Sequence, residues 1–256
     1  MFNILHAAPL LILLAASTLA HAQSDPRPLQ EEDKYVRAVL IVPPAFRELD
    51  PAMKLPVEIR VKGTVNDKGV MESVEYSPVE GNEKFIAAIE RVLSLWIFRP
   101  AVDGVSCAPI ASTGVLLVWF EERDGKPVVS VSMPKMQPPA KPIDAKPAPV
   151  PRDLEIRPKA TYPRSARRAG MEGTAELLFK VDQKGEVLQT RVVYSSPLKE
   201  FGEEALAGAR RVKFSAAAAD ADIQKAICIV APYVFCLPDG AKHPSPACVN
   251  RKFETK

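Results

Sequence analysis

Histidine is nearly absent from this sequence. The 256-residue chain has three, and two of them, His6 and His21, lie in an N-terminal hydrophobic segment that we expect to be a targeting sequence. His243 alone cannot form a multi-histidine metal site, and a Ser-His-Asp triad would depend on this one residue near the C-terminus. The composition therefore argues against most hydrolases and metalloenzymes, and we expect no catalytic residue, no metal and no cofactor.

Features of several other functional classes are also missing. The sequence has no CxxC pair, which thioredoxin-like redox proteins use, and no glycine-rich phosphate loop. The net charge is only +3, with 34 basic and 31 acidic residues, so we expect no nucleic-acid partner. With 47% hydrophobic residues the chain is too apolar for a disordered protein, and its length is about twice that of a usual domain.

The N-terminus carries the one long hydrophobic run. Residues 4–19 read ILHAAPLLILLAASTL and are followed by AHA at 20–22, which fits the small-residue rule for signal-peptide cleavage. We predict a signal peptide over residues 1–22, since 16 residues are short for a span that needs about 20. No Lys or Arg precedes the run, so an uncleaved inner-membrane anchor facing the periplasm stays the alternative. Both readings place the remaining chain in the oxidising periplasm.

Proline is concentrated in one internal segment. Residues 124–158 contain nine prolines, which remove backbone donors and prevent a continuous helix, so we predict an extended linker. This segment divides the chain into a lobe at 34–123 and a lobe at 159–240, followed by a tail at 241–256.

The two lobes show the same order of predicted elements. Each has an alternating strand, a turn ending in Lys-Gly, a second strand, an amphipathic helix and a last strand. A shift of 116 residues pairs Val65 with Val181, Lys68 with Lys184, Gly69 with Gly185, Phe85 with Phe201, Phe98 with Phe214, Ala101 with Ala217 and Trp119 with Phe235. We predict an α+β protein of two small lobes, each a three-stranded antiparallel sheet covered by a helix.

A motif at the start of the second lobe points to a known family. The run YPRSARRAGMEG at 162–173, continued by a strand, an Asp-x-x-Gly turn, a Ser-Ser pair and an Ala-rich helix, resembles the C-terminal domain of the TonB family of periplasmic energy transducers. The match covers about 80 residues, and the first lobe resembles a more diverged copy that keeps WIFRPA at 96–101. The motif positions, which suit helix starts, tight turns and core, are Tyr162, Pro163, Ala166, Arg167, Gly170, Gly173, Gly185 and Phe214.

The resemblance implies a protein-binding function. Such domains bind an extended segment of an outer-membrane transporter by adding it as a strand to an exposed sheet edge. The candidate edges are residues 114–121 and 227–236. Pro232 is typical of an edge strand, but it could equally guard against unwanted pairing, and both edges stay open as candidates. The residues assigned to these strands are Val115, Leu117, Trp119, Ile229, Tyr233 and Phe235.

The order of segments departs from that of a true transducer. The family pattern is an inner-membrane helix, a Pro-rich spacer and one terminal domain, whereas here the Pro-rich segment lies between the lobes and only residues 23–33 follow the hydrophobic run. If the signal is cleaved, nothing tethers the chain to the inner membrane. A soluble periplasmic adaptor or structural module without energy coupling is therefore the alternative function, and inner-membrane motor proteins are expected partners only if the anchor remains.

Two further features concern the surface and the cysteines. Residues 157–168 carry five basic side chains and no acid, which favours an anionic envelope surface or peptidoglycan as a further partner. A Cys236–Cys248 disulfide is our first choice because these residues bracket a Pro-rich loop. Cys228–Cys248 is the rival, leaving Cys107 as a buried thiol or paired elsewhere. A zinc site of Cys236, His243 and Cys248 lacks a clear fourth ligand.

Overall fold

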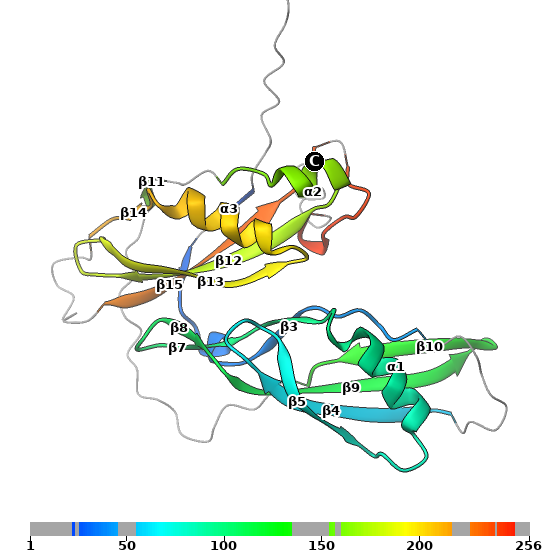
Figure 1. The fold of residues 1–256 in the computed structure, drawn as a ribbon. Coiled ribbons are helices and arrows are strands. Elements are labelled where there is room, and N and C mark those ends of the chain that lie inside the picture. Colours follow the sequence, from blue (N-terminus) through cyan, green and yellow to red (C-terminus); the bar gives the residue numbers. More distant parts are fainter. Residues whose placement is uncertain are drawn as a thin grey trace, which may run out of the picture.

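The structure is a computed structural model of mixed α and β character (Figure 1). It describes residues 22–23, 26–45, 55–134, 154–156, 160–216, 226–238 and 240–248. Nearly all of the predicted signal peptide lies outside the described residues, as do residues 135–153 and 157–158 of the predicted linker and Ala217 of the predicted 116-residue shift. Within the described part of the chain, no helix has both the length and the apolar character needed to cross a bilayer.

The sheet built mainly from the C-terminal half, here called the second sheet, has five antiparallel strands. They are β1 (Ala22–Gln23), β2 (Arg27–Pro28), β12 (Gly173–Val181), β13 (Val187–Ser196) and β15 (Ile227–Phe235). β12 lies between β13 and β15, and both β1 and β2 pair with the other edge of β15. Two helices, α2 (Arg164–Ala169) and α3 (Lys199–Ala209), come from the same half of the chain.

The first sheet has the order β10-β9-β4-β5. Its strands are β4 (Val57–Val65), β5 (Met71–Ser77), β9 (Ser112–Arg123) and β10 (Lys126–Ser132), and its helix is α1 (Glu83–Leu93). A 3₁₀ helix η1 (Glu31–Lys34) precedes it. Three short antiparallel pairs complete the fold: β3 (Arg37–Leu40) with β6 (Ile97–Arg99), β7 (Ala101–Asp103) with β8 (Ala108–Ile110), and β11 (Leu154–Ile156) with β14 (Lys213–Phe214).

Both faces of the second sheet are buried. Side chains alternate across a strand, so Leu177, Phe179 and Ile229 lie in the core beneath α3. Leu178 and Val230 point to the opposite face, where they pack with residues of the β7–β8 hairpin. Figure 1 shows α3 on one side of β12–β15 and β7–β8 on the other, so part of the first half of the chain covers the second sheet.

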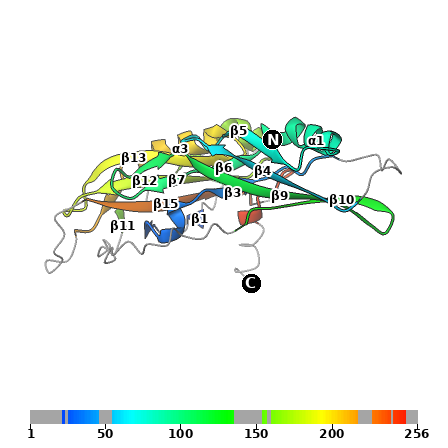
Figure 2. The ribbon, with the colours of Figure 1, turned by 90° about the horizontal axis from the view of Figure 1, so that it is seen from below.

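The first sheet has its own core on one face. α1 buries Phe85, Ile86 and Ile89, which recur at helical spacing and pack on the buried side chains of β4 and β9. The burial of β4 alternates strictly, as the sequence pattern predicts for a strand with one covered face. In the view of Figure 2 the molecule is elongated, and the β9–β10 hairpin reaches one end of it.

Both sheets contain more than the three strands predicted. Residues 126–132, which the high proline content had assigned to the linker, form β10 and pair with β9. Asp124 and Gly125 both have positive φ (53° and 70°), the geometry of the tight hairpin turns that Asp-Gly favours. Proline is accepted in β10 because this strand lies at the edge of the sheet.

One turn contact recurs in the two sheets. Gly185 has φ +82°, and its carbonyl accepts the backbone N–H of Phe214 at 3.2 Å. Gly69 has φ +77°, and its carbonyl accepts the N–H of Phe98 at 3.1 Å. These residues are pairs of the predicted 116-residue shift, although the tandem relationship itself stays a prediction.

The last pair of that shift, Trp119 with Phe235, is wrong by one residue. Phe235 is buried beneath α3 with its ring centroid 5.0 Å from that of Phe201. In the first sheet the corresponding contact is made by Phe120, whose ring lies 4.7 Å from Phe85. Trp119 points to the other face, because neighbouring residues of a strand alternate in direction.

Candidate partner-binding edge

The outer edge of β15 is occupied by the N-terminal segment of the same chain. β12 pairs with all of β15 on one side, from Gly173 opposite Phe235 to Val181 opposite Ile227. On the other side β2 and β1 follow the strand in antiparallel register. The pairs are Pro28 with Ile229, Arg27 with Val230, Gln23 with Tyr233 and Ala22 with Val234. The edge that the sequence assigned to a partner strand is therefore paired within the chain.

The candidate edge of the first sheet is also paired over most of its length. β9 lies between β4 and β10, and β10 pairs from Lys126 opposite Arg123 to Ser132 opposite Leu117. Trp119 lies opposite Ser130 on one side and Glu58 on the other. Val115 lies beyond the last β10 pair, so only the start of β9 extends past its neighbour.

The side chains assigned to partner binding differ between the two edges. Ile229, Tyr233 and Phe235 are buried in the core beneath α3, where they stabilise the fold. Val115, Leu117 and Trp119 are half-buried on the face of β9 that points away from α1. A partner adding to β15 would therefore recognise the backbone of the strand and not these three side chains.

A buried ion-pair cluster lies beside β15 and joins the two halves of the chain. Arg99, at the end of β6, donates from Nε to Glu176 of β12 at 2.6 Å, and its Nη2 lies 2.9 Å from Asp33 of η1. The side chains of Arg99 and Asp33 are 2% and 0% exposed. Arg27 of β2 binds both oxygens of Asp33, at 2.6 and 2.9 Å, and Arg37 of β3 binds it at 3.0 Å.

The pKa values of the two carboxylates in this cluster are shifted in opposite directions. Burial acts to raise the pKa of Asp33, but hydrogen bonds from Arg27 and the Gln30 backbone N–H, together with the charge of Arg99, hold the pKa below its usual range. Burial raises the pKa of Glu176 above its ordinary value, and Arg99 offsets only part of that rise. The ionised form of Asp33 is thus stabilised by its partners, whereas burial destabilises the ionised form of Glu176.

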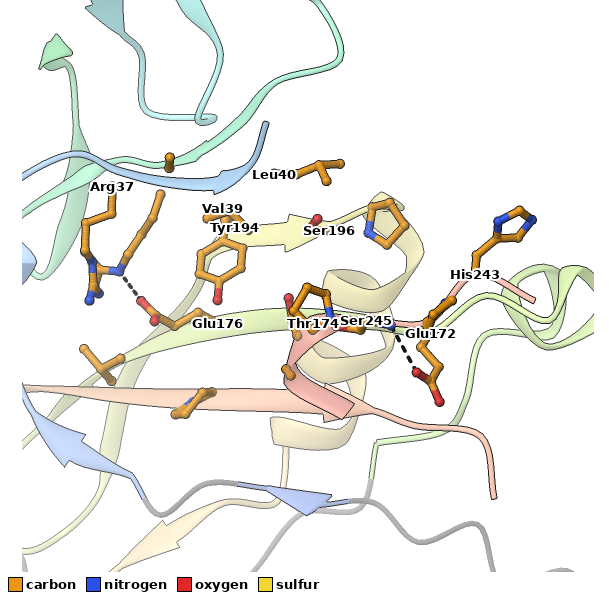
Figure 3. Close-up of a pocket in the computed structure, with 18 of the residues that line it drawn as sticks. Arg37, Val39, Leu40, Glu172, Thr174, Glu176, Tyr194, Ser196, His243 and Ser245 are labelled. Atoms are coloured by element: carbon orange, nitrogen blue, oxygen red, sulfur yellow. Dashed lines mark hydrogen bonds and ion pairs between the residues drawn. The ribbon is translucent and has the colours of Figure 1, made fainter. Parts of the chain in front are cut away.

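A cavity of about 480 Å³ opens next to the cluster (Figure 3). The strand β3 lines one side, and Thr174, Glu176 and Tyr194 of the second sheet line another. A C-terminal segment closes one end and is held by Glu172, whose carboxylate accepts the backbone N–H groups of Leu237 at 2.9 Å and Ser245 at 3.1 Å. Burial, and then the charge of Glu176, raises the pKa of Tyr194.

Two disulfides fix the ends of β15. Cys228, in β15, is joined to Cys107 in the β7–β8 turn, and Cys236, directly after β15, is joined to Cys248. The pairing preferred from the sequence is thus present, and Cys107 is the partner of Cys228. The Cys236 and Cys248 sulfurs lie near the Glu172 carboxylate, but in a disulfide neither of them is a thiolate ligand for zinc.

The motif residues of the second half build the fold. The Tyr162 hydroxyl donates to the Met171 carbonyl at 2.8 Å, and its ring meets Phe235 edge-on at 5.8 Å. Burial, with the charge of Glu172, raises the pKa of Tyr162 to about 12. The other motif positions are Pro163 directly before α2, Ala166 buried within it, Arg167 exposed on it, Gly170 at its end, Gly173 at the start of β12, Gly185 in the turn and Phe214 in the core.

Residues 158–237 match the family model described as Gram-negative bacterial TonB protein C-terminal. They form a TonB C-terminal-like domain. The solution NMR structure of the Pseudomonas aeruginosa TonB C-terminal domain is similar to this chain at 20% identity, covering 34% of this chain and 86% of that one, with a TM-score of 0.28. None of the curated proteins compared with this chain matches it.

One edge of the sheet in the TonB C-terminal-like domain is formed by strands from outside the matched range. β1 and β2 belong to residues 22–28, whereas the matched range starts at residue 158. Arg99, which binds Glu176 of the domain, and Asp33, which binds Arg99, also lie outside it. The sequence analysis predicted none of the five members of this cluster: Arg27, Asp33, Arg37, Arg99 and Glu176. The one available signal was a charged residue, Arg99, between two core positions of the WIFRPA motif.

Proposed function

We propose that this protein is a periplasmic TonB-like protein that binds an extended segment of an outer-membrane transporter by β-strand addition, in TonB-dependent transport. The binding edge is the outer edge of β15 in the TonB C-terminal-like domain. We further propose that the chain forms two lobes joined by a Pro-rich segment, that the first lobe is a diverged copy of the second, and that the protein is not an enzyme.

The observation that carries this proposal is the pairing of β15. Its outer edge already accepts short antiparallel strands at two places, on either side of Pro232. The buried side chains of β15 fix the strand from below, so its backbone groups are positioned to receive an extended segment. This geometry supports a site that recognises main chain first and side chains second.

A peptide titration tests the proposal. Synthetic peptides from transporter N-termini are titrated into the mature protein and into a variant lacking residues 23–30, and binding is followed by calorimetry. We expect saturable binding, and we expect a peptide with a central proline to bind more weakly because proline cannot donate to the ladder. Absence of binding to both proteins would contradict strand addition.

Leu117→Pro in β9 tests the first-sheet edge, and unchanged affinity for the transporter peptides would exclude that edge.

An anionic envelope surface is the second candidate partner. Arg164, Arg167 and Arg168 of α2 are exposed, and none of them forms an ion pair with another described residue. A cationic surface of this kind attracts anionic lipid or the cell wall. Cosedimentation with peptidoglycan tests this role, which would make the protein an adaptor without energy coupling. A triple Arg→Gln variant that sediments like the wild type would contradict it.

Export and anchoring decide between these roles. We propose that the signal peptide over residues 1–22 is removed and that the mature protein lies in the periplasm. The intact mass of the native protein, measured after separating periplasm from membranes, is expected to correspond to a chain starting at Gln23. A full-length, membrane-bound species would instead favour an anchored protein and would make inner-membrane motor proteins the next partners to test.

A further inference from the structure

We propose that Gln23 and residues 26–29 form a built-in competitor segment, which keeps the partner-binding edge of β15 closed until another strand displaces it. This inference rests on the proposed function, because it concerns the regulation of the same edge. The competing strand is supplied by the chain itself.

The segment occupies the backbone of β15 at both ends of the strand. Pro28 and Arg27 pair with Ile229 and Val230, and the Leu29 N–H donates to the Cys228 carbonyl at 3.0 Å. Further along, Gln23 pairs with Tyr233. A partner strand needs these same backbone positions, so it cannot add to this edge of β15 while the segment is in place.

Among the described residues, few contacts hold the segment. β2 has only two residues, and Gln23 is the one residue of β1 that remains after removal of residues 1–22. Arg27 ties β2 to η1 by hydrogen bonds to Asp33 and a looser ion pair with Glu32 at 3.6 Å. Leu29 adds an apolar contact with the small cluster around Val230. Such short pairing is marginal by itself, because ordering each residue costs about 1–2 kcal/mol of backbone entropy.

Departure of the segment leaves the folded core intact. The next residues, in η1, are anchored independently, because Asp33 still contacts Arg99 and Arg37 after Arg27 has left. Arg99 keeps its own hydrogen bond to Glu176. The hinge therefore lies at Gln30, between a weakly held strand and a firmly held 3₁₀ helix.

The same geometry defines a preferred partner sequence. Arg27 lies opposite Val230 and reaches a carboxylate, Asp33, that stays fixed when the segment leaves. A displacing strand with Arg or Lys at this position regains the ion pair, and one with an apolar residue there does not. We therefore expect the partner of β15 to be an extended segment with a basic residue opposite Val230.

The test uses the segment itself as the probe. A labelled peptide with the sequence of residues 23–30 is titrated into the mature protein and into the variant lacking residues 23–30. We expect the variant to bind the peptide at least about tenfold more tightly, because apparent affinity scales with the fraction of molecules whose edge is open. An Arg27→Ala version of the peptide is expected to bind the variant more weakly than the natural sequence.

Smaller changes in the full chain provide matched controls. Leu29→Pro removes the donor to Cys228, and we expect it to increase binding of the peptide, whereas Leu29→Val retains the N–H and is expected to behave as the wild type. Equal binding of the peptide by the mature protein and the deletion variant, or no binding to the variant while circular dichroism shows it folded, would overturn the inference. Transporter peptides that bind both proteins equally would overturn it while leaving the proposed function in place.

Discussion

Arg99 is a buried residue that joins the two halves of the chain. It binds one carboxylate from η1 and one from the TonB C-terminal-like domain. A buried ion pair is weak support for stability as a whole, but removal of one partner leaves an uncompensated charge in the interior. The cluster therefore specifies how the halves fit together more than it increases the total stability.

Arg99→Met is expected to lower the free energy of unfolding by about 3–5 kcal/mol, because Glu176 loses the side chain that neutralises it. Urea denaturation followed by tryptophan fluorescence measures this loss. The matched control is Arg123→Met, which removes an exposed ion pair with Glu121 and is expected to cost less than about 1 kcal/mol. Equal losses in the two variants would contradict the role assigned to Arg99.

Glu176 gives the cluster a defined pH dependence. Because burial raises the pKa of Glu176 above 4.5, the folded state binds the proton more tightly than the unfolded chain. The contribution of this group to the free energy of unfolding therefore falls as the pH rises from about 4.5 through the raised pKa. Glu176→Gln does not titrate, so we expect the stability of this variant relative to the wild type to increase between pH 4 and 7. A difference that is constant with pH would show that the pKa is not raised.

Helices and strands that bury one regular face could be predicted from the periodicity of apolar residues in the sequence. The helix around Phe85 and the strand around Val61 were predicted correctly, since each buries one regular face. β10 was missed because its proline was given more weight than its alternating valines. β1 and β2 have two residues each and carry no pattern, so their pairing with β15 depends on the folded domain. The ion pair of Arg99 with Glu176 joins residues 77 positions apart and leaves no local signal.

Substitutions at two turn glycines distinguish the cost of backbone strain from the cost of a steric clash. Gly125 has φ +70° and open space around it, so Gly125→Ala is expected to cost only the strain of the left-handed conformation, about 1–2 kcal/mol. Gly185 has φ +82°, and an added Cβ would lie 2.0 Å from the Phe214 carbonyl oxygen. Gly185→Ala is therefore expected to lower the free energy of unfolding clearly more than Gly125→Ala does. Thermal unfolding of both variants checks this order, and equal costs would contradict the close contact.

One disulfide connects the two halves of the chain, and the other closes a short loop. Cys107–Cys228 spans 121 residues, and Cys236–Cys248 spans 12. In the loop-entropy model the longer loop contributes about 5 kcal/mol and the shorter about 3. We expect Cys107→Ala/Cys228→Ala to lower the urea midpoint more than Cys236→Ala/Cys248→Ala. The reverse order would indicate that the halves hold together without the covalent link.

The two cross-links also have a mechanical consequence for β15. A load applied along a strand added to this edge would pull on β15 in shear, and β15 is covalently retained near its start by Cys228 and just beyond its end by Cys236. The pull would pass through sulfur bonds into the β7–β8 turn and the C-terminal segment before the hydrogen bonds to β12 had to carry it alone. We therefore expect β15 to resist being pulled out of its sheet along the strand direction.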